Sequence, residues 1–435
     1  MFSYYIRLGL RSLRRNPVLT GLMVLTIAVG VAASMATFAV FRAVSGDPIP
    51  DKSAQLFKPQ IDSWGPTLNN TKEPLDAMDY TDAMALMRAH KAAKQVVSYP
   101  VDLSVLPNDP ASRPFQEAGY ATYSDFFSMF EVPFKYGSAW SAAQDAQHGN
   151  QVVISSKLNQ RLFGGTDSVG RSINLSGNQF RIVGVIQPWD PQPRFYDVVN
   201  GRTFADPPQL WITFTRAIDL QIPSFGGRSC SDNSSAGFAG FLQSDCVWLS
   251  YWAELPKPAA AAAYMRYLQS YAADQQHAGR FTWKAKVRLS SVTQWLDLQH
   301  VVPQESKVSM LLSLGFLVVC LVNTIGLLLA KFMRRAPEIG VRRALGASRA
   351  AVYQQFLIEA AMVGLAGGVL GLLLTAGAVL GIGLIFAPQI ARLAHVDLTL
   401  LGLTVVLAVA ATVIAAFYPT WRASRVQPAW QLRAN

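Results

Sequence analysis

The stretch that decides the fold is KFMRRAPEIGVRRALGASRAAVYQQFLIEA, residues Lys331 to Ala360, which lies between two long apolar segments. Its basic side chains far outnumber its one early acid, Glu338; they are Lys331, Arg334, Arg335, Arg342, Arg343 and Arg349. Because Lys and Arg gather in the cytoplasmic loops of membrane proteins, we expect this stretch on the cytoplasmic side.

The same stretch contains a helix start and a helix stop. Proline is tolerated in a first helical turn and an acid suits the positive end of the helix dipole, so Ala336-Pro337-Glu338 predicts a start. Gly346 predicts the end. Ile339, Val341 and the apolar residues after them alternate with the charges. The sequence therefore predicts a short basic helix that lies across the membrane, in a position where a partner could bind it.

Four apolar stretches reach the roughly 20 residues needed to cross a bilayer. They are Val18–Phe41, Val308–Ala330, Phe356–Phe386 and Leu398–Tyr418. The expected segments are a cytoplasmic amphipathic pre-helix (1–17), a first membrane helix (18–45), an outer domain (46–303), a second helix (304–330), a cytoplasmic loop (331–355), a third helix (356–387), an outer loop (388–397), a fourth helix (398–418) and a cytoplasmic tail (419–435).

The positions of the basic residues along the chain indicate membrane topology. The chain carries a net charge of +11, which can indicate nucleic-acid binding when it is spread over one surface. Here residues 1–17 hold about +4, the 331–349 loop about +5 and the tail about +3, so the rest sums to about −1. We therefore expect no nucleic-acid partner.

The beginning of the chain allows two interpretations. Basic residues before an apolar run are typical of a secretory signal, but this run exceeds a signal's usual length and no clear small-residue cleavage site follows it. We expect a retained first helix. The arginines of residues 1–17 alternate with Phe2, Tyr5, Ile6 and leucines, which favours an amphipathic helix on the inner membrane surface.

The motif inside the basic stretch resembles a known family. EIGVRRALGAS, from Glu338 to Ser348, followed by QFLIEA, from Gln355 to Ala360, is similar to the loop of MacB/FtsX-like (type VII) ABC transporter permeases. A merely basic loop would explain the arginines but not this order. The resemblance implies that the loop joins the second and third membrane helices and contacts an ATPase subunit. Its coupling residues would be Glu338, Ile339, Gly340, Arg342, Arg343, Gly346 and Arg349.

The roles of individual side chains in that loop remain alternatives. Glu338 could pair with a basic residue of the ATPase. Arg342, Arg343 and Arg349 could bind the ATPase or pair with anionic lipid.

The outer domain shows an alternation of strand and helix patterns. Expected strands are 55–64, 94–106, 113–120, 152–155, 171–175, 179–186 and 281–289; expected helices are 79–90, 124–130, 156–164, 258–277 and 291–300. The block VVISSKLNQRLFGGTDSVGRSINLSGNQFRIVGV resembles a segment of MacB-like periplasmic domains. Its glycines lack the GxxxxGK[ST] order of a phosphate loop, so we interpret them as turns. Like that family, the domain is expected to have two lobes, with the middle part inserted.

Residues 187–256 have no sustained periodicity and are expected to form long loops or an insertion. Their aromatic side chains could face a partner or a hydrophobic cargo, or could equally belong to the core. They are Trp189, Phe195, Tyr196, Phe225, Phe238, Phe241 and Trp248.

Three cysteines allow one disulfide. Cys230 and Cys246 both lie in the outer domain, where an oxidising periplasm would let them pair, although two free buried thiols remain an alternative. Cys320 lies in a membrane helix. In that helix Asn323 and Thr324 are expected to face other helices, and Gly367-xxx-Gly371 and Gly377-xxx-Gly381 in the next one allow close packing with a helix of the same or a second chain.

No catalytic, cofactor or metal site is expected in this chain. The five histidines have no ligand at metal spacing, and GxSxG, HExxH and Walker A motifs are absent from the sequence. If ATP drives the protein, another chain must hydrolyse it, with Mg²⁺ bound in that partner.

The resemblance implies an α-helical membrane protein with four transmembrane helices and a large α+β periplasmic domain between helices 1 and 2. It implies a multi-pass protein of the bacterial inner membrane with both termini cytoplasmic. The expected partners are two ABC ATPase subunits, a second identical or homologous permease chain, membrane lipid and, for export, a periplasmic adaptor and an outer-membrane channel. Mechanotransmission would drive export of peptides, antibiotics or other amphiphiles; alternatives are LolC-like lipoprotein extraction and FtsX-like regulation of a cell-wall hydrolase without transport.

Overall fold

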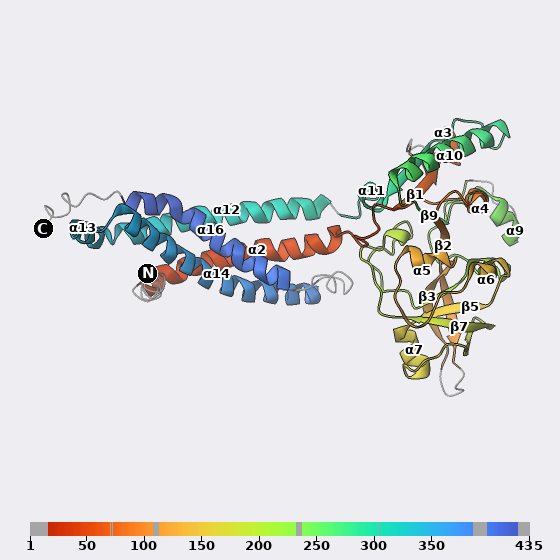
Figure 1. The fold of residues 1–435 in the computed structure, drawn as a ribbon, viewed down its shortest axis with the longest axis horizontal. Coiled ribbons are helices and arrows are strands. Elements are labelled where there is room, and N and C mark those ends of the chain that lie inside the picture. Colours follow the sequence, from red (N-terminus) through yellow and green to blue (C-terminus); the bar gives the residue numbers. More distant parts are fainter. Residues whose placement is uncertain are drawn as a thin grey trace. The chain divides into compact units, whose positions relative to one another are not determined.

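The computed structural model describes residues 16–69, 71, 73–107, 113–231, 237–302, 304–385 and 398–424 (Figure 1). The chain forms two compact units, a helical unit of residues 1–45 and 302–435 and a sheet unit of residues 46–301. The expected outer domain spanned 46–303. The expected pre-helix over 1–15 and the expected outer loop over 388–397 lie outside the described residues.

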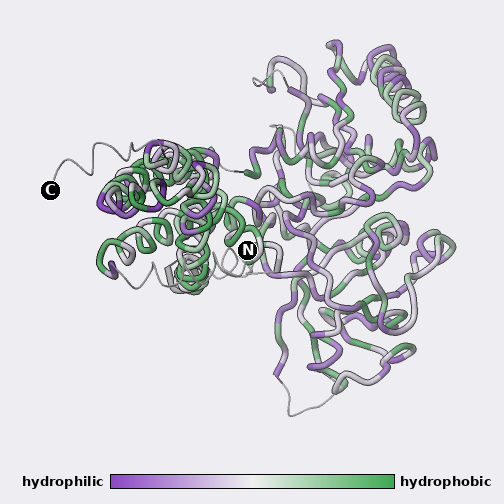
Figure 2. The backbone as a smooth tube through the Cα atoms, turned by 60° about the vertical axis from the view of Figure 1, so that its left-hand side comes forward, coloured by the Kyte–Doolittle hydropathy of each residue, from purple (hydrophilic) through white to green (hydrophobic). Residues whose placement is uncertain are grey.

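In the described part of the helical unit, four helices are long and apolar enough to cross a membrane. They are α2 (Pro17–Ser45), α12 (Gln304–Met333), α14 (Arg349–Ile385) and α16 (Leu398–Ser424). Figure 2 shows hydrophobic residues along most of these four helices. The hydropathy pattern therefore predicted their existence correctly.

Two helix ends differ from the expectation. α14 begins at Arg349 rather than at Phe356, because the backbone N–H of Ala351 donates to the Ser348 hydroxyl and the alanines that follow favour a helix. α16 continues through Pro419 to Ser424, whereas the cytoplasmic tail was expected to start at 419. Proline is tolerated in membrane helices when neighbouring groups satisfy the freed backbone.

Glycine lets the helices of this unit approach closely. A Cβ added at Gly367 would lie 2.9 Å from Ile27 Cγ2 of α2, and one at Gly371 would lie 3.3 Å from the Ala28 carbonyl oxygen. The first small-xxx-small pair therefore packs against a helix of the same chain. For the second pair, Gly377 and Gly381, no atom of the described residues lies within 4 Å of such a Cβ.

The sheet unit is organised around one ten-stranded mixed sheet with the order β10-β1-β9-β2-β3-β8-β5-β7-β4, in which β6 pairs with β2 and β7. The strands are β1 (Leu56–Ile61), β2 (Lys94–Leu106), β3 (Phe115–Thr122), β4 (Phe134–Gly137), β5 (Gln151–Ser155), β6 (Ser172–Leu175), β7 (Asn178–Ile186), β8 (Leu210–Thr213), β9 (Ser250–Glu254) and β10 (Val287–Ser291). The first and last strands, β1 and β10, pair antiparallel at one edge, so the two flanks of the domain meet there.

The helices around this sheet are short except for one. They are α3 (Gly65–Leu68), α4 (Tyr80–Ala89), α5 (Asp125–Met129), α6 (Ala142–Ala146), α7 (Ser156–Phe163), α8 (Phe214–Asp219), α9 (Gly237–Gln243), α10 (Pro258–His277) and α11 (Val292–Leu298), with a 3-10 turn η1 (Phe195–Asp197). α4 and α7 start at side-chain caps, Asp79 and Ser155, whose oxygens accept backbone N–H bonds.

Two expectations for this unit are wrong. Residues 187–256 do not form only loops, because β8 and β9 from this region lie inside the sheet, where both faces are covered and no alternation is visible in the sequence. The last strand begins at Val287 instead of Phe281, because its partner β1 ends at Ile61 and the ladder cannot extend further.

The core has two layers, one on each face of the sheet. Tyr251 and Ala253 of β9 belong to one hydrophobic cluster, and Trp252 between them belongs to the other. Successive side chains of a strand point to opposite faces, so each cluster covers one face. Phe195, Tyr196 and Trp248 are buried in these clusters, whereas Phe225 is 56% exposed. Most of the aromatic residues of 187–256 therefore belong to the core.

Candidate coupling site around the short helix α13

The predicted basic helix exists and links two of the long helices. α13 (Ala336–Ala344) has Pro337 in its first turn and Glu338 beside it. It lies at the end of the helical unit where α12 ends and α14 begins (Figure 1). Gly346 follows it with φ of +96°, and Ala347 N–H donates to the Arg342 carbonyl at 3.0 Å. A left-handed residue here lets the chain turn into α14.

One face of α13 is buried against the helical unit. Ala336, Ile339 and Gly340 are buried, and Ile339 belongs to the hydrophobic cluster that the long helices share. Two of the expected coupling residues, Ile339 and Gly340, therefore hold the helix in place and present little surface.

The opposite face of α13 is apolar and exposed. Val341 is 53% exposed and Leu345, just after the helix, is 82% exposed. Pro337 is exposed on the same side. We call Pro337, Val341 and Leu345 the outer stripe. Sequence reasoning did not single it out, although its i, i+4, i+8 spacing was readable and predicts one helix face.

The charged residues of α13 form a surface network. Arg342 Nη2 donates to Glu338 Oε1 at 2.8 Å, one helical turn away, and Arg342 Nη1 donates to Gln355 Oε1 at 3.1 Å on α14. Both partners of the ion pair are more than one third exposed. Arg343 is half-buried and Arg349 is exposed at the start of α14. Such exposed pairs stabilise a fold little, so Glu338 remains accessible to a partner.

An ion cluster connects the residues just before α13 to α14. Lys331 Nζ lies 2.7 Å from Glu359 Oε1, and Arg335 Nη1 lies 3.0 Å from Glu359 Oε2. The Lys331 and Glu359 side chains are 0% and 2% exposed. The contact at Lys331 is an ion pair and not an aligned hydrogen bond. We call Lys331, Arg335 and Glu359 the anchor cluster.

The anchor cluster was missed because sequence analysis quoted Glu359 only as part of a motif. The sequence did contain a sign of this cluster: Glu359 is a single acid in an otherwise apolar stretch, 24 residues after Arg335. A lone ionisable group in a membrane helix needs a partner. The cluster ties the end of α12 to α14, and the Phe332 and Phe356 rings, 4.3 Å apart between centroids, pack beside it.

The anchor cluster joins the two helices that flank α13. α13 follows α12 and precedes α14 in the chain, and Glu359 of α14 contacts Lys331 of α12 and Arg335 just before α13. Among the described residues, no group of three or more His, Cys, Asp or Glu side chains could hold a metal ion.

The predicted cysteine pair lies in the sheet unit. Cys230 Sγ and Cys246 Sγ are 2.00 Å apart, as in a disulfide. Cys320 is buried in α12, where a Cβ added at Gly30 of α2 would lie 2.9 Å from its Cβ. Of the two polar residues nearby, Thr324 is buried and donates to the Cys320 carbonyl at 2.8 Å, but Asn323 is exposed on α12.

Two family models match this chain. The MacB-like periplasmic core domain matches residues 20–271, which is more than half of the chain, and the FtsX-like permease C-terminal domain matches residues 310–428. The two matches together include α2, most of the sheet unit, α13 and the other long helices.

Two curated relatives with similar sequences share the printed name "Macrolide export ATP-binding/permease protein MacB". The protein from Bordetella avium (strain 197N) is 27% identical over 440 residues, which cover 98% of this chain and 59% of that protein. The one from Salmonella typhimurium (strain LT2) is 24% identical over 259 residues, which cover 58% of this chain and 34% of that protein. The chain thus spans about three fifths or less of these relatives' length.

Solved structures give a weak likeness. The periplasmic region of MacB from Actinobacillus actinomycetemcomitans has a TM-score of 0.37 at 9% identity and covers 56% of this chain and 92% of that one. The extracellular domain of YknZ from Gram-positive bacteria has a TM-score of 0.35 at 9% identity and covers 54% and 99%.

The family models and the fold agree with the motif in the basic stretch. The chain has four membrane-spanning helices and a mixed-sheet periplasmic domain between the first two. It is a multi-pass membrane protein, and it belongs to the MacB/FtsX-like (type VII) ABC transporter permeases.

Proposed function

We propose that this chain is the permease subunit of an ATP-driven export system, in which a separate ABC ATPase binds α13 and moves it. The observation that carries the proposal is the outer stripe on a helix whose other face is buried against the long helices, next to the anchor cluster. An exposed apolar stripe beside charged residues is typical of a helix that fits into a groove of a partner. ATP hydrolysis and Mg²⁺ binding are assigned to that partner.

The mechanism follows from how α13 is held. Closure of two ATPase subunits displaces α13, and the anchor cluster passes this displacement to α12 and α14. α12 leads back into the periplasmic domain through its N-terminal end, and α2 leads into it at its C-terminal end. Movement therefore reaches the periplasmic domain through the two helices that flank it, without a charged pathway through the membrane.

The orientation and the partners are part of the same proposal. The positive charge of the 331–349 stretch favours the cytoplasmic side of the inner membrane, with both termini on that side. The exposed Asn323 among apolar residues of α12 favours a second permease chain, because amides in membrane helices usually face another helix. Export of amphiphiles such as antibiotics or peptides is supported by the printed name of the relatives. An adaptor and an outer-membrane channel would complete that route.

Co-purification with the cognate ABC ATPase tests the proposal. Val341→Glu combined with Leu345→Glu places two charges on the outer stripe, and because both side chains are exposed we expect the variant to fold. We expect the tagged full chain to lose the ATPase almost completely, since two desolvated carboxylates would cost several kcal/mol or about a hundredfold or more in affinity.

A matched control keeps this test specific. Gln354→Glu adds a negative charge at another exposed position, on α14 nine residues further along, and should leave the complex intact. Equal recovery of the ATPase with the stripe variant and the wild-type chain would contradict binding through α13.

A further inference from the structure

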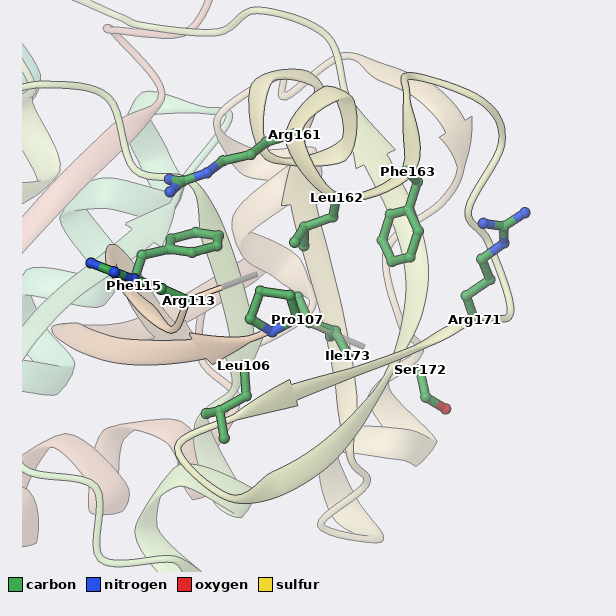
Figure 3. A pocket seen from close by; sticks show the side chains of 10 residues that line it. All are labelled: Leu106, Pro107, Arg113, Phe115, Arg161, Leu162, Phe163, Arg171, Ser172 and Ile173. Carbon is green, nitrogen blue, oxygen red and sulfur yellow. The ribbon is translucent and has the colours of Figure 1, made fainter. Parts of the chain in front are cut away.

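A cavity of about 620 Å³ lies in the sheet unit, and the proposed function above uses none of its lining residues (Figure 3). Its wall comes from the end of β2, the start of β3, the last turn of α7 and strand β6. β6 pairs with β2 through Leu106 and Asn174, which fixes the floor. A cavity of this size falls within the usual range for small-ligand sites, roughly 300–1,000 Å³.

The floor and side walls of the cavity are apolar. Its apolar lining residues are Leu106, Pro107, Phe115, Leu162, Phe163 and Ile173. Figure 3 shows the Phe115 and Phe163 rings on two sides, with Leu162 between them and Leu106 and Pro107 below. Apart from the buried Ile173, these side chains are only partly buried, so each keeps exposed surface that a ligand could contact.

Three arginines stand at the rim of this apolar surface: Arg113, Arg161 and Arg171. All three are exposed. The Arg161 guanidinium lies 3.3 Å from the centroid of the Phe115 ring, and the Arg171 guanidinium lies 5.3 Å from that of Phe163. Stacking on a ring orients a guanidinium while its N–H groups in the plane stay able to donate.

Among the described residues of the rim, the three arginines meet one carboxylate in an ion pair. Glu117 accepts a hydrogen bond from Arg161 Nη1 at 3.1 Å. A guanidinium carries five N–H donors, so Arg161 can still bind a second oxyanion. Arg171 lies on the opposite side of the cavity, next to Phe163 (Figure 3). Arginines fixed in this way favour planar or tetrahedral oxyanions, such as carboxylate and phosphate.

We propose that this cavity binds an amphiphile with one oxyanion head and an alkyl body, the head at the arginine rim beside Arg161 and the alkyl chain against Phe115, Leu162 and Ile173. The proposal does not depend on α13 or on an ATPase. It assigns a ligand class to the periplasmic domain itself, whether the ligand is cargo or a lipid that regulates the domain.

Protection of an introduced thiol tests this site in the full chain in nanodiscs. Ser172→Cys places a thiol at an exposed position that lines the cavity. The chain's own cysteines give a low background, because Cys230 and Cys246 are joined and Cys320 is buried. The rate of modification by a membrane-impermeant maleimide is measured against octanoate, octyl phosphate and the uncharged octanamide.

We expect octanoate or octyl phosphate to slow the modification in a saturable way and octanamide to require at least about tenfold higher concentration, because it lacks the charge-assisted hydrogen bonds. Arg161→Gln combined with Arg171→Gln should raise the half-protecting concentration of the anions by about tenfold or more and leave that of octanamide unchanged. A stronger effect of octyl phosphate would identify a phosphate-headed lipid, and a stronger effect of octanoate a fatty acid.

Two controls separate binding from other effects. Ser270→Cys places a thiol at an exposed position on α10, and its modification should not respond to any of the three compounds. The unliganded modification rate of the Ser172→Cys thiol should be the same with and without the arginine substitutions, which shows that the site still folds. No protection by either anion, or equal protection by octanamide, would overturn the proposal.

Discussion

Each of the two units buries one lysine almost completely, and the two are stabilised in different ways. Lys331 of the helical unit is 0% exposed and lies 2.7 Å from the Glu359 carboxylate. Lys58 of the sheet unit is 2% exposed and lies over two indole rings, 4.7 Å from the centroid of Trp295 and 5.6 Å from that of Trp252. Its ammonium donates to the Ser250 hydroxyl at 3.3 Å.

The surroundings of Lys58 shift its titration. Burial lowers the pKa of Lys58 from 10.5 to about 8, and the nearby carboxylates of Asp76 and Asp197 partly oppose this effect. Indole faces attract a cation but do not neutralise it. Lys58 is therefore a cation that the sheet unit tolerates at some cost.

The comparison teaches how differently the two units accommodate a buried cation. In a membrane unit a buried cation needs a carboxylate partner, since water and unpaired charge are both excluded. In a periplasmic core the same side chain can be held between aromatic rings and can become neutral. In the anchor cluster, ion pairs hold two helices together. At the Lys58 site, the cation packs against aromatic rings and has a pKa lowered by burial.

The largest expected effect comes from removing the carboxylate of the anchor cluster. Glu359→Gln removes the carboxylate that Lys331 and Arg335 share and leaves the Lys331 ammonium buried without it, which should destabilise the helical unit by about 3–5 kcal/mol. The measurement is the unfolding midpoint of the full chain in nanodiscs.

The matched variant for this test combines Glu359→Gln with Lys331→Met. Removing the buried cation together with its anion should recover most of the lost stability, because an apolar side chain of similar size replaces the unpaired charge. If Glu359→Gln alone leaves the midpoint unchanged, the anchor cluster does not hold α12 to α14.

Substitution of Lys58 is expected to change stability less than Glu359→Gln does, and to increase it rather than decrease it. Below pH 8 the folded chain keeps a buried charge, and between about 8 and 10.5 the unfolded chain binds a proton that the folded chain has lost. Stability should therefore rise with pH across this window. Lys58→Met should remove this rise and stabilise the sheet unit at pH 7 by about 1–2 kcal/mol, the relief of burial less the lost cation–π contacts.

Scanning calorimetry of the full chain at pH 7, 8, 9 and 10 would measure this effect. Lys135→Met is the control, because Lys135 also lies over a ring, that of Tyr136 at 5.1 Å, but is exposed. It should leave the pH dependence as in the wild-type chain. A Lys58→Met chain that is less stable at pH 7 would show that the ring contacts outweigh the cost of burial.

The smallest change in stability is expected for an exposed ion pair. Glu338→Gln removes the exposed ion pair with Arg342, and we expect a change in stability below about 0.5 kcal/mol, which salt should reduce further. Thermal unfolding at low and high salt measures it. A loss as large as that of Glu359→Gln would mean that the α13 pair supports the fold, and that its role in partner binding could not be separated from folding.

Local signals predicted most of the elements that position the candidate site. Helix α13 starts at the Ala336-Pro337 step and ends before Gly346 because a helix start and stop depend on neighbouring residues alone. α10 has the expected bounds for the same reason, with Pro258 in its first turn. The strands β8 and β9 were not predicted from the sequence, because they are short and buried on both faces and so show no alternation of apolar and polar residues.

The sequence alone determined the four membrane helices, the basic helix between the second and third, and the family, because hydropathy, charge and motif order are local properties of the chain. Tertiary structure alone decided which face of α13 is buried, that Glu359 neutralises both Lys331 and Arg335, and that Lys58 lies between two tryptophans. These contacts join residues far apart in the chain. Their free energy depends on burial and distance, which no local pattern of residues encodes.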